Sequence, residues 1–333
     1  MPVRHRFVGS LTILAICCLL AGLRLVPSLT SRAATLSNYT PAKANMQILP
    51  RKLTSPMQAP APTISIYEST TNATILQQQG CKMAHRAPGL IILDWGQPVY
   101  MGNNVYGTYD FGGNDDTDTA IMHAVANFVQ GIWNCHTAST NIALGIGESN
   151  YFSDHALPLT PAAWHADGQQ WGTIVNDVQS FLNANHYNNV VGANGAGDLE
   201  VEWESFLLTS SMVNGYNSVT RHAYFDFGDD SPGWWTNAQV WYVAYGAPDN
   251  LPLPEIYYNA DAVYDWEALN IWACRYEGGP MYFKGTMSEF VPGTNTPAQA
   301  FMDMYNAEAS NSCTARDLPG MLFSTQIYHT GQF

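Results

Sequence analysis

Leu90-Ile91-Ile92-Leu93-Asp94 is a short apolar run that ends in an acid, and it begins the pattern that decides the fold. Residues 117–133 follow, with apolar side chains at the three- and four-residue spacing of an amphipathic helix. The run 142–146 then predicts another strand, and residues 171–182 predict another helix. Strands that alternate with helices indicate a parallel sheet covered by helices, which is an α/β fold.

The alternation continues along the chain. We expect further strands at 190–202, 221–227, 240–245, 254–258 and 281–287, and helices at 206–213, 262–274 and 297–309. This count reaches seven strands. An eighth strand is then either present but unrecognised in the sequence, absent from the fold, or formed by residues 63–67. Polar residues recur where these strands end, as at the catalytic rim of a (β/α) barrel. The sequence therefore predicts a single TIM-barrel-like domain, irregular or short of eight strands if one is absent, with an open doubly wound sheet as the alternative.

The first 33 residues have the order of a secretion signal. Arg4 and Arg6 precede an apolar stretch at residues 7–23, and small residues around Ala33 would suit a signal peptidase. An uncleaved N-terminal anchor is the alternative, because the apolar stretch is almost long enough to cross a membrane. Prolines recur after it, so we expect an extended linker and lead-in at residues 34–86 and the barrel domain at residues 87–333.

Charge and composition limit the classes of partner that this chain is expected to bind. Removing residues 1–33 would take away four arginines and no acids, and would change the net charge from −14 to −18. Such a chain repels nucleic acid and anionic lipid, so membrane contact is expected only through an uncleaved N-terminal segment. Only 12% of the residues are charged, whereas there are 10 Trp, 18 Tyr and 27 Gly. This composition suits an extracellular or cell-surface protein that meets polysaccharide or cell-wall glycan.

Four cysteines follow the signal: Cys81, Cys135, Cys274 and Cys313. In an exported chain they predict two disulfides, for which three pairings are open. We favour Cys81 with Cys135 and Cys274 with Cys313, because each pair ties neighbouring segments. The sequence contains neither a C-x-x-C knuckle nor an H-E-x-x-H motif, so no metal or other cofactor is expected.

The segment Gly197-Asp198-Leu199-Glu200-Val201-Glu202-Trp203-Glu204 carries the candidate chemistry. In a strand, Asp198, Glu200 and Glu202 would share one face. Repulsion and partial burial would raise the pKa of at least one carboxyl group, which is how a general acid is made. The alternative is a structural rim network in which the acids accept hydrogen bonds from loop amides and Arg221.

Asp198-Leu199-Glu200, following Asp94 on the first predicted strand, resembles the D-x-E arrangement of family 25 lysozymes and, more loosely, of family 18 chitinases. The resemblance implies that Glu200 is the general acid and that Asp198 and Asp94 assist it. Our count puts the motif on the third strand, whereas those families have it on the fourth. Residues 94–98, 147–151, 245–248 and 253–257 also resemble a family of exported bacterial proteins with a glycosidase-like barrel and no established activity.

Several polar and aromatic residues at predicted strand ends are candidates for sugar contacts. They are Glu202, Asn150, Tyr151, Trp171, Asp226, Tyr245, Glu255 and Tyr257. For each, packing in the core or at the rim is the alternative. The favoured hypothesis is a secreted or surface-held glycan hydrolase, and the alternative is a non-catalytic barrel that binds glycans or partners at the cell surface.

Overall fold

Eight parallel strands form the main sheet of this protein, in a computed structural model that describes residues 58–86, 88–151, 157–230 and 234–332. The order across the sheet is β10-β11-β1-β2-β6-β7-β8-β9, so the strands follow chain order around it. Their bounds are β1 (Thr63–Tyr67), β2 (Gly89–Asp94), β6 (Ile142–Ser149), β7 (Val191–Asp198), β8 (Tyr224–Asp226), β9 (Asn250–Pro252), β10 (Gly285–Glu289) and β11 (Phe323–His329). The expected signal sequence lies outside the described residues.

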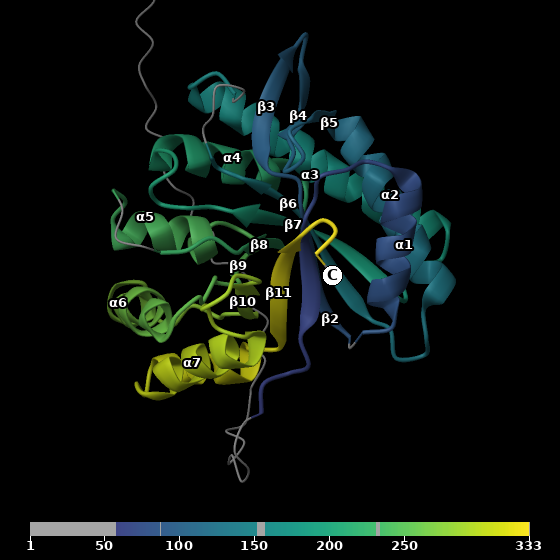
Figure 1. The fold of residues 1–333 in the computed structure, drawn as a ribbon. Helices are drawn as coiled ribbons and strands as arrows, with labels where there is room; N and C mark the ends of the chain where they lie inside the picture. Colours follow the sequence, from purple (N-terminus) through teal and green to yellow (C-terminus); the bar gives the residue numbers. More distant parts are fainter. Residues whose placement is uncertain (1–57, 87, 152–156, 231–233, 333) are drawn as a thin grey trace, which may run out of the picture. The chain divides into compact units, whose positions relative to one another are not determined.

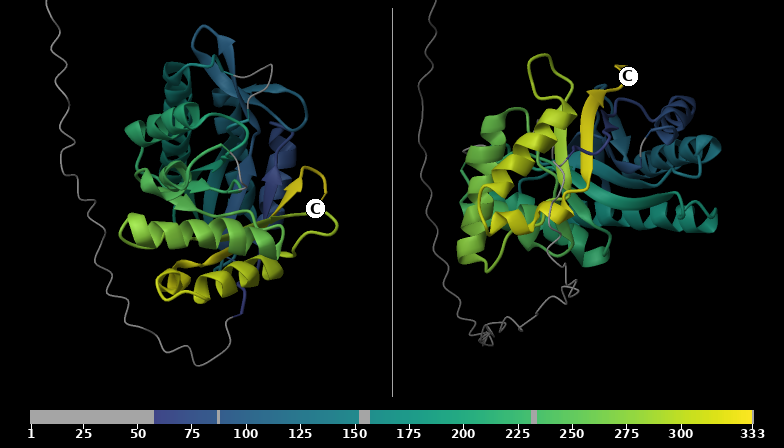
Figure 2. Two further views of the ribbon diagram at one scale, coloured as in Figure 1. Left: turned by 90° about the vertical axis from the view of Figure 1, so that its left-hand side faces the viewer. Right: turned by 90° about the horizontal axis from the view of Figure 1, so that it is seen from below.

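Helices connect the strands and lie outside the sheet (Figure 1). They are α1 (Ala73–Ala84), α2 (Asp118–Cys135), α3 (Pro161–Ala184), α4 (Phe206–Val219), α5 (Asn237–Trp241), α6 (Ala268–Tyr276) and α7 (Pro297–Ala309), with π-helical turns η1 (Tyr242–Gly246) and η2 (Asp261–Glu267). Two short 3₁₀ turns, η3 (Thr314–Arg316) and η4 (Leu318–Gly320), precede β11. Figure 2 shows the continuous η2–α6 helix beside α7, in agreement with their packing.

The sheet curls until its two edge strands approach each other. The backbone N–H of Met287 in β10 donates to Pro254 O, and that of Ile256 donates to Met287 O, both at 2.9 Å. These bonds surround an isolated parallel bridge between Glu255 and Met287. The α/β class is confirmed, and a curled parallel sheet with helices outside is compatible with a TIM-barrel-like fold.

Both faces of the sheet are apolar, which explains the unbroken apolar run in β2. Leu90 and Ile92 pack inside the curl with Phe225 and Met287, whereas Ile91 and Leu93 pack on the helices. Alternation therefore directs Asp94, at the end of β2, to the inner face. The same rule places Asp198 inside, because Ala196 belongs to the inner cluster.

Two expectations at the chain ends need correction. The fold begins before residue 87, because β1 and α1 lie within the segment expected to be linker and lead-in. Residues 63–67, which were a candidate for the eighth strand, form β1. The final strand β11 was not expected, nor was the small antiparallel sheet of β3 (Gln97–Gly102), β4 (Val105–Tyr109) and β5 (Asp115–Thr117).

Three expected strands also differ. Residues 240–245 are helical, because Thr236 and Gln239 form a capping box that starts α5 and the chain continues into η1. The strand expected at 254–258 is reduced to the Glu255 bridge, with β9 lying just before it. The strand expected at 190–202 ends at Asp198, so the alternation assumed beyond that residue does not hold.

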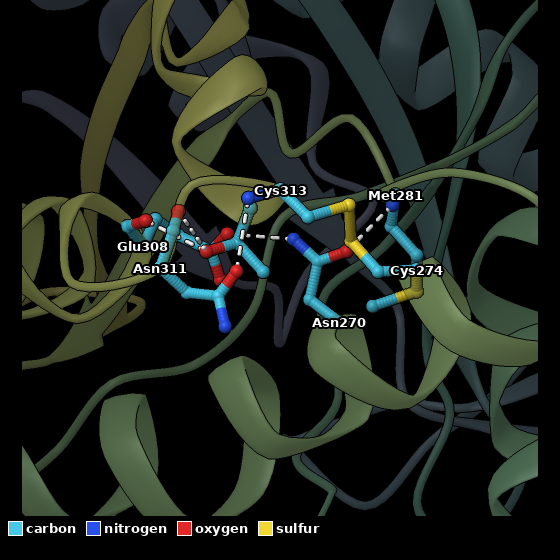
Figure 3. Close-up of a disulfide and its surroundings, with 7 residues drawn as sticks. Asn270, Cys274, Met281, Glu308, Asn311 and Cys313 are labelled. Atoms are coloured by element: carbon cyan, nitrogen blue, oxygen red, sulfur yellow. Dashed lines mark hydrogen bonds between the residues drawn. A yellow bond between two sulfur atoms is a disulfide. The ribbon is translucent and has the colours of Figure 1, made fainter.

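Both favoured disulfide pairings are confirmed. Cys81 in α1 is bonded to Cys135 at the end of α2, and Cys274 in α6 is bonded to Cys313 before η3. Beside the second bond, Asn270 donates to Glu308 at 2.6 Å and accepts from Met281 N at 2.7 Å (Figure 3). Two disulfides are consistent with an extracellular protein. In the described part of the chain, none of the helices has both the length and the apolar character needed to cross a membrane.

Candidate functional site

Acidic side chains meet at the carboxyl end of the sheet. Asp94, Asp198 and Asp226 are the last residues of β2, β7 and β8. Glu200 lies two residues beyond β7, and Glu255 lies on the bridge after β9. All five are buried. They lie together because parallel strands end on the same side of the sheet and bring their terminal residues together there.

Asp198, Glu200 and Glu255 form the centre of this site, which we call the acid triad. One carboxylate oxygen from each lies within 4.8 Å of the other two. Their exposed fractions are 5%, 9% and 1%. Three carboxyl groups this close and this buried cannot all ionise cheaply, so the site retains protons that exposed acids would lose.

Burial is the main cause of the shifted pKa values. It raises the pKa of Glu200 to about 8, and the charges of Asp229, Glu202 and Asp226 add to that shift. Burial, followed by the charge of Glu255, raises the pKa of Asp198 well above its ordinary value. Glu200 is therefore mostly protonated at neutral pH, which is the state of a proton donor.

The two acids beside the triad are shifted in the same direction. Burial raises the pKa of Asp94 to about 7 and that of Asp226 to about 8. Backbone N–H groups, including those of Gly96 and Gly228, oppose both shifts. Asp94 Oδ1 accepts from Gly96 N at 3.0 Å, whereas its Oδ2 accepts no hydrogen bond from the described residues.

Glu255 is the member of the triad that accepts hydrogen bonds from two tyrosines. Tyr67 Oη donates to its Oε1 at 3.4 Å, and Tyr257 Oη donates to its Oε2. Burial raises the pKa of Glu255, and the hydrogen bond from Tyr257 opposes that shift. Hydrogen bonds to a carboxylate favour its charged form, so the two tyrosines reduce the cost of placing a negative charge on Glu255.

Asn150 positions the turn that presents Glu200. Its Nδ2 donates to Glu200 O at 2.9 Å and to Thr209 Oγ1 at 3.0 Å, and its Oδ1 accepts from Glu200 N at 2.9 Å. Asn150 is fully buried. The expectation of a sugar contact is corrected, because its side-chain amide is occupied within the protein.

Two other expected sugar contacts lie elsewhere. Trp171 in α3 is buried in the core, where its Nε1 donates to Ile146 O at 2.9 Å. Tyr245 is in η1 and packs against the rings of Trp241 and Tyr282. The position of Tyr245 depended on a predicted strand that is helical in the structure.

The D-x-E motif begins at the last residue of the fourth strand. In chain order the main sheet contains β1, β2, β6 and then β7, and our sequence count had omitted β1. The expected shared face extends only from Asp198 to Glu200, because the chain turns after β7 and leaves Glu202 exposed. Glu202 lies instead at the outer side of the site, with one oxygen within 4.8 Å of Glu200 and Asp229 oxygens.

A pocket of ≈ 330 Å³ opens beside Asp198. Its aromatic lining consists of Tyr67, Phe111, Tyr151 and Trp203, and Ser149, Glu289 and His329 are among the polar residues. Tyr151 and Trp203 meet edge to face with ring centroids 5.4 Å apart. Of the expected residues, Tyr151 and Asp198 line this pocket.

Sequence reasoning missed most of the aromatic wall. Tyr67 and His329 end β1 and β11, so the strand-end rule would have found them once those strands were recognised. Phe111 lies on the β4–β5 connection, where no periodic pattern marks it.

Comparison with protein-family models and with curated proteins finds no match. Among solved structures, the chain is similar to one described as an enolase, a putative galactarate dehydratase from Agrobacterium radiobacter with bound Na and L-malate. The TM-score is 0.39 at 10% identity, over 82% of this chain and 52% of that one. This chain thus spans about half the length of that protein.

Proposed function

We propose that this protein is an exported glycan hydrolase on a (β/α) barrel, with Glu200 as the proton donor. One observation carries the proposal: the acid triad, in which one oxygen from each carboxylate lies within 4.8 Å of the other two, is at the carboxyl end of the strands beside an aromatic-lined pocket. Paired carboxyl groups flanking a glycosidic bond are the usual apparatus of glycoside hydrolysis. Aromatic rings supply apolar faces on which sugar rings stack.

Glu255 is the second catalytic carboxyl group in this proposal. Retaining enzymes separate their two carboxyl groups by about 5–5.5 Å, and inverting enzymes by about 6.5–9.5 Å. The short separation of the triad favours retention. Glu200 protonates the leaving oxygen while Glu255 attacks the anomeric carbon. Water, deprotonated by Glu200, then releases the sugar from Glu255.

Two further observations support the proposal. The D-x-E motif begins at the end of the fourth strand, and the glycosidase families that it resembles have their motif on the fourth strand. The two disulfides agree with export, which residues 1–33 would direct.

The test is hydrolysis of a panel of polysaccharides and peptidoglycan, with products detected by mass spectrometry. We expect Glu200→Gln to lower kcat by at least about 100-fold. The matched control is Glu277→Gln, which makes the same change at an exposed residue after α6 and should leave the rate unchanged. Since the donor must hold a proton, kcat/KM should fall as the pH rises through about 8.

Equal rates for the wild type and Glu200→Gln would contradict the proposal. Glycan binding without turnover, unaffected by Glu200→Gln, would favour the alternative of a non-catalytic binding protein.

A further inference from the structure

We infer that the substrate is cationic: a glycan whose sugars carry free amino groups, which the acidic rim of the site recognises. This inference rests on the proposed function and specifies its substrate class. It depends on two separate observations, the acids around the pocket and the distribution of basic residues over the rest of the fold.

The acid triad continues outward into a second ring of acids. Glu202 and Asp229 lie next to Glu200, with one oxygen from each of the three within 4.8 Å of the others. Burial raises the pKa values of Asp261 and Asp265, and the charge of Asp229 adds a smaller upward shift to each. A ligand entering the site thus passes partly exposed acids before it reaches buried ones.

Asp198 supplies an open position for a donor inside the pocket. It is 5% exposed and lines the pocket, yet its Oδ1 accepts no hydrogen bond from the described part of the chain. A buried acceptor without a donor is destabilising. An ammonium group carries three donors and could satisfy Asp198 together with a neighbouring acid.

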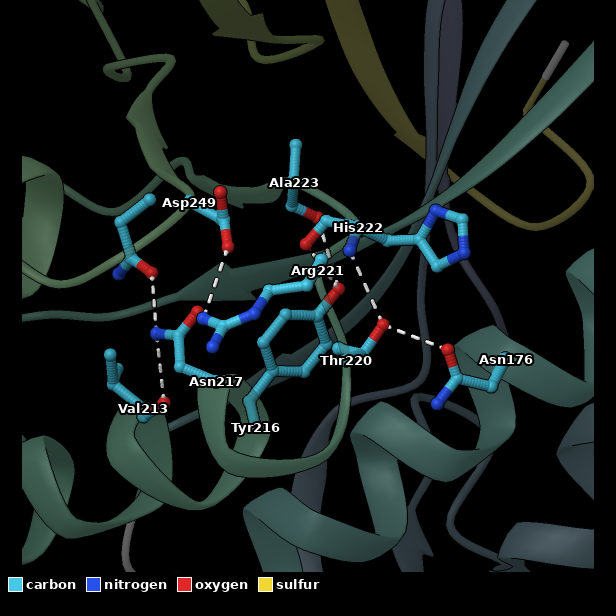
Figure 4. A network of polar contacts seen from close by, with 10 residues as sticks. Asn176, Val213, Tyr216, Asn217, Thr220, Arg221, His222, Ala223 and Asp249 are labelled. Carbon is cyan, nitrogen blue, oxygen red and sulfur yellow. Dashed lines mark hydrogen bonds and ion pairs between the residues drawn. The ribbon is translucent and has the colours of Figure 1, made fainter. Parts of the chain in front are cut away.

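The lysines and arginines lie at the opposite end of the sheet, whereas His329 lines the pocket. The described part of the chain contains six of them: Lys82, Arg86, Arg221, Arg275, Lys284 and Arg316. Each lies late in a helix, or between a helix and the next strand, and so near the amino ends of the strands. Arg221, for example, precedes β8 and pairs with Asp249 before β9 at 3.7 Å (Figure 4).

This separation of charge gives the rim a negative potential. Among the described residues, the neighbours that shift the pKa values of the triad are acids and tyrosines. Clefts lined by one sign of charge concentrate ligands of the opposite sign. An anionic glycan would be repelled by the outer acids, and a neutral glycan would gain nothing from them. A glycan of free amino sugars would be attracted by the outer acids and would donate hydrogen bonds to the inner ones.

The test compares chitosan oligosaccharides with their N-acetylated counterparts, a neutral β-glucan and a polyuronate of equal length. We expect kcat/KM to be at least about tenfold higher on the free amino substrate, and to fall between about 20 and 500 mM salt as screening increases. The double variant Glu202→Gln, Asp229→Asn should lose most of this preference. Glu277→Gln should retain it.

Binding to the inactive Glu200→Gln variant, followed by calorimetry, tests the inference without turnover. Preference for the free amino oligosaccharide over the acetylated one supports it. If the wild type cleaved neutral or acetylated glycans without that preference, the inference would be overturned and the proposed hydrolase would stand. If the wild type cleaved none of the glycans, the proposed hydrolase would be overturned. Activity that requires Ca²⁺ or Mg²⁺ and is lost on chelation would also overturn the inference, because a metal ion would then be the cation in the triad.

Discussion

At the scale of single residues, the site depends on how Glu200 is held as well as on its chemistry. Asn150 bonds to both the N–H and the carbonyl of Glu200, so it replaces the strand neighbour that Glu200 lacks beyond the end of β7. Backbone groups in such a buried turn must be paired somewhere. A side-chain amide, with a donor and an acceptor at its tip, can pair both.

We predict that Asn150→Ala lowers kcat by about 10- to 100-fold with little change in KM, because a displaced donor loses alignment with the reacting bond. The loss of these buried hydrogen bonds should also reduce the free energy of unfolding by about 1–3 kcal/mol. Kinetics on the best substrate and urea unfolding measure the two effects.

The matched control is Asn217→Ala. Asn217 is also buried and donates to Val213 O and Asn250 Oδ1, but it lies in the network before β8 and β9 that Figure 4 shows. It should lose similar stability and retain kcat. If both variants lost kcat equally, a positioning role for Asn150 would be excluded.

At the scale of elements, the disulfides tie segments in different parts of the fold. Cys81–Cys135 joins α1 to α2 and closes a sequence separation of 54 residues, while Cys274–Cys313 joins α6 to the turn before η3 over 39 residues. Neither bond contacts the acid triad. Their role is therefore to limit the unfolded chain and hold the outer helices.

We predict that the double variant Cys274→Ala, Cys313→Ala has a free energy of unfolding about 2–4 kcal/mol lower than the wild type. This is the usual effect of removing a disulfide that closes a loop of this length. Denaturant unfolding of the double variant measures the change, and kcat under native conditions should stay within about twofold. A large loss of kcat in a fully folded double variant would mean that this bond supports the site directly.

At the scale of the whole molecule, acids are buried outside the acid triad as well as within it. Burial raises the pKa of Glu68 to about 8, of Asp118 to about 7 and of Glu308 to about 9. A folded pKa above the unfolded one means that the folded state binds more protons. The stabilising contribution is therefore fully present below about pH 4 and is lost as the pH rises through about 7 to 9.

We predict that the melting temperature is highest in mildly acidic buffer and falls steadily toward pH 9. The excess of acidic residues acts in the same direction, through self-repulsion. Glu308→Gln should flatten this fall, because it removes a group that must otherwise ionise in a buried position while keeping an acceptor for Asn270. Thermal unfolding across pH 4.5–9 measures both, and a melting temperature that rises with pH would contradict the prediction.

The candidate site was predictable only in part. Asp94 and Asp226 were identified at predicted strand ends, and Glu255 as a polar residue within an apolar run. Asp198 and Glu200 were identified from the alternating acidic segment, and the fold brings all five together. Asn150 and Trp171 were assigned to sugar contact because sequence reveals residue type but not burial. Tyr67 and His329 were missed because their strands lie outside the regular alternation of strands and helices seen in the sequence.

The sequence by itself predicted the α/β class, the helix α7 with its bounds and the D-x-E acids, and it favoured the observed disulfide pairing among three open ones. These depend on local periodicity, on the short span between paired cysteines and on residue type. Tertiary structure alone decided that β7 stops at Asp198, that Glu255 approaches Glu200 from across the curled sheet, and that basic residues collect at the opposite end. Those features depend on how far the sheet curls and which strands become neighbours, which no local pattern encodes.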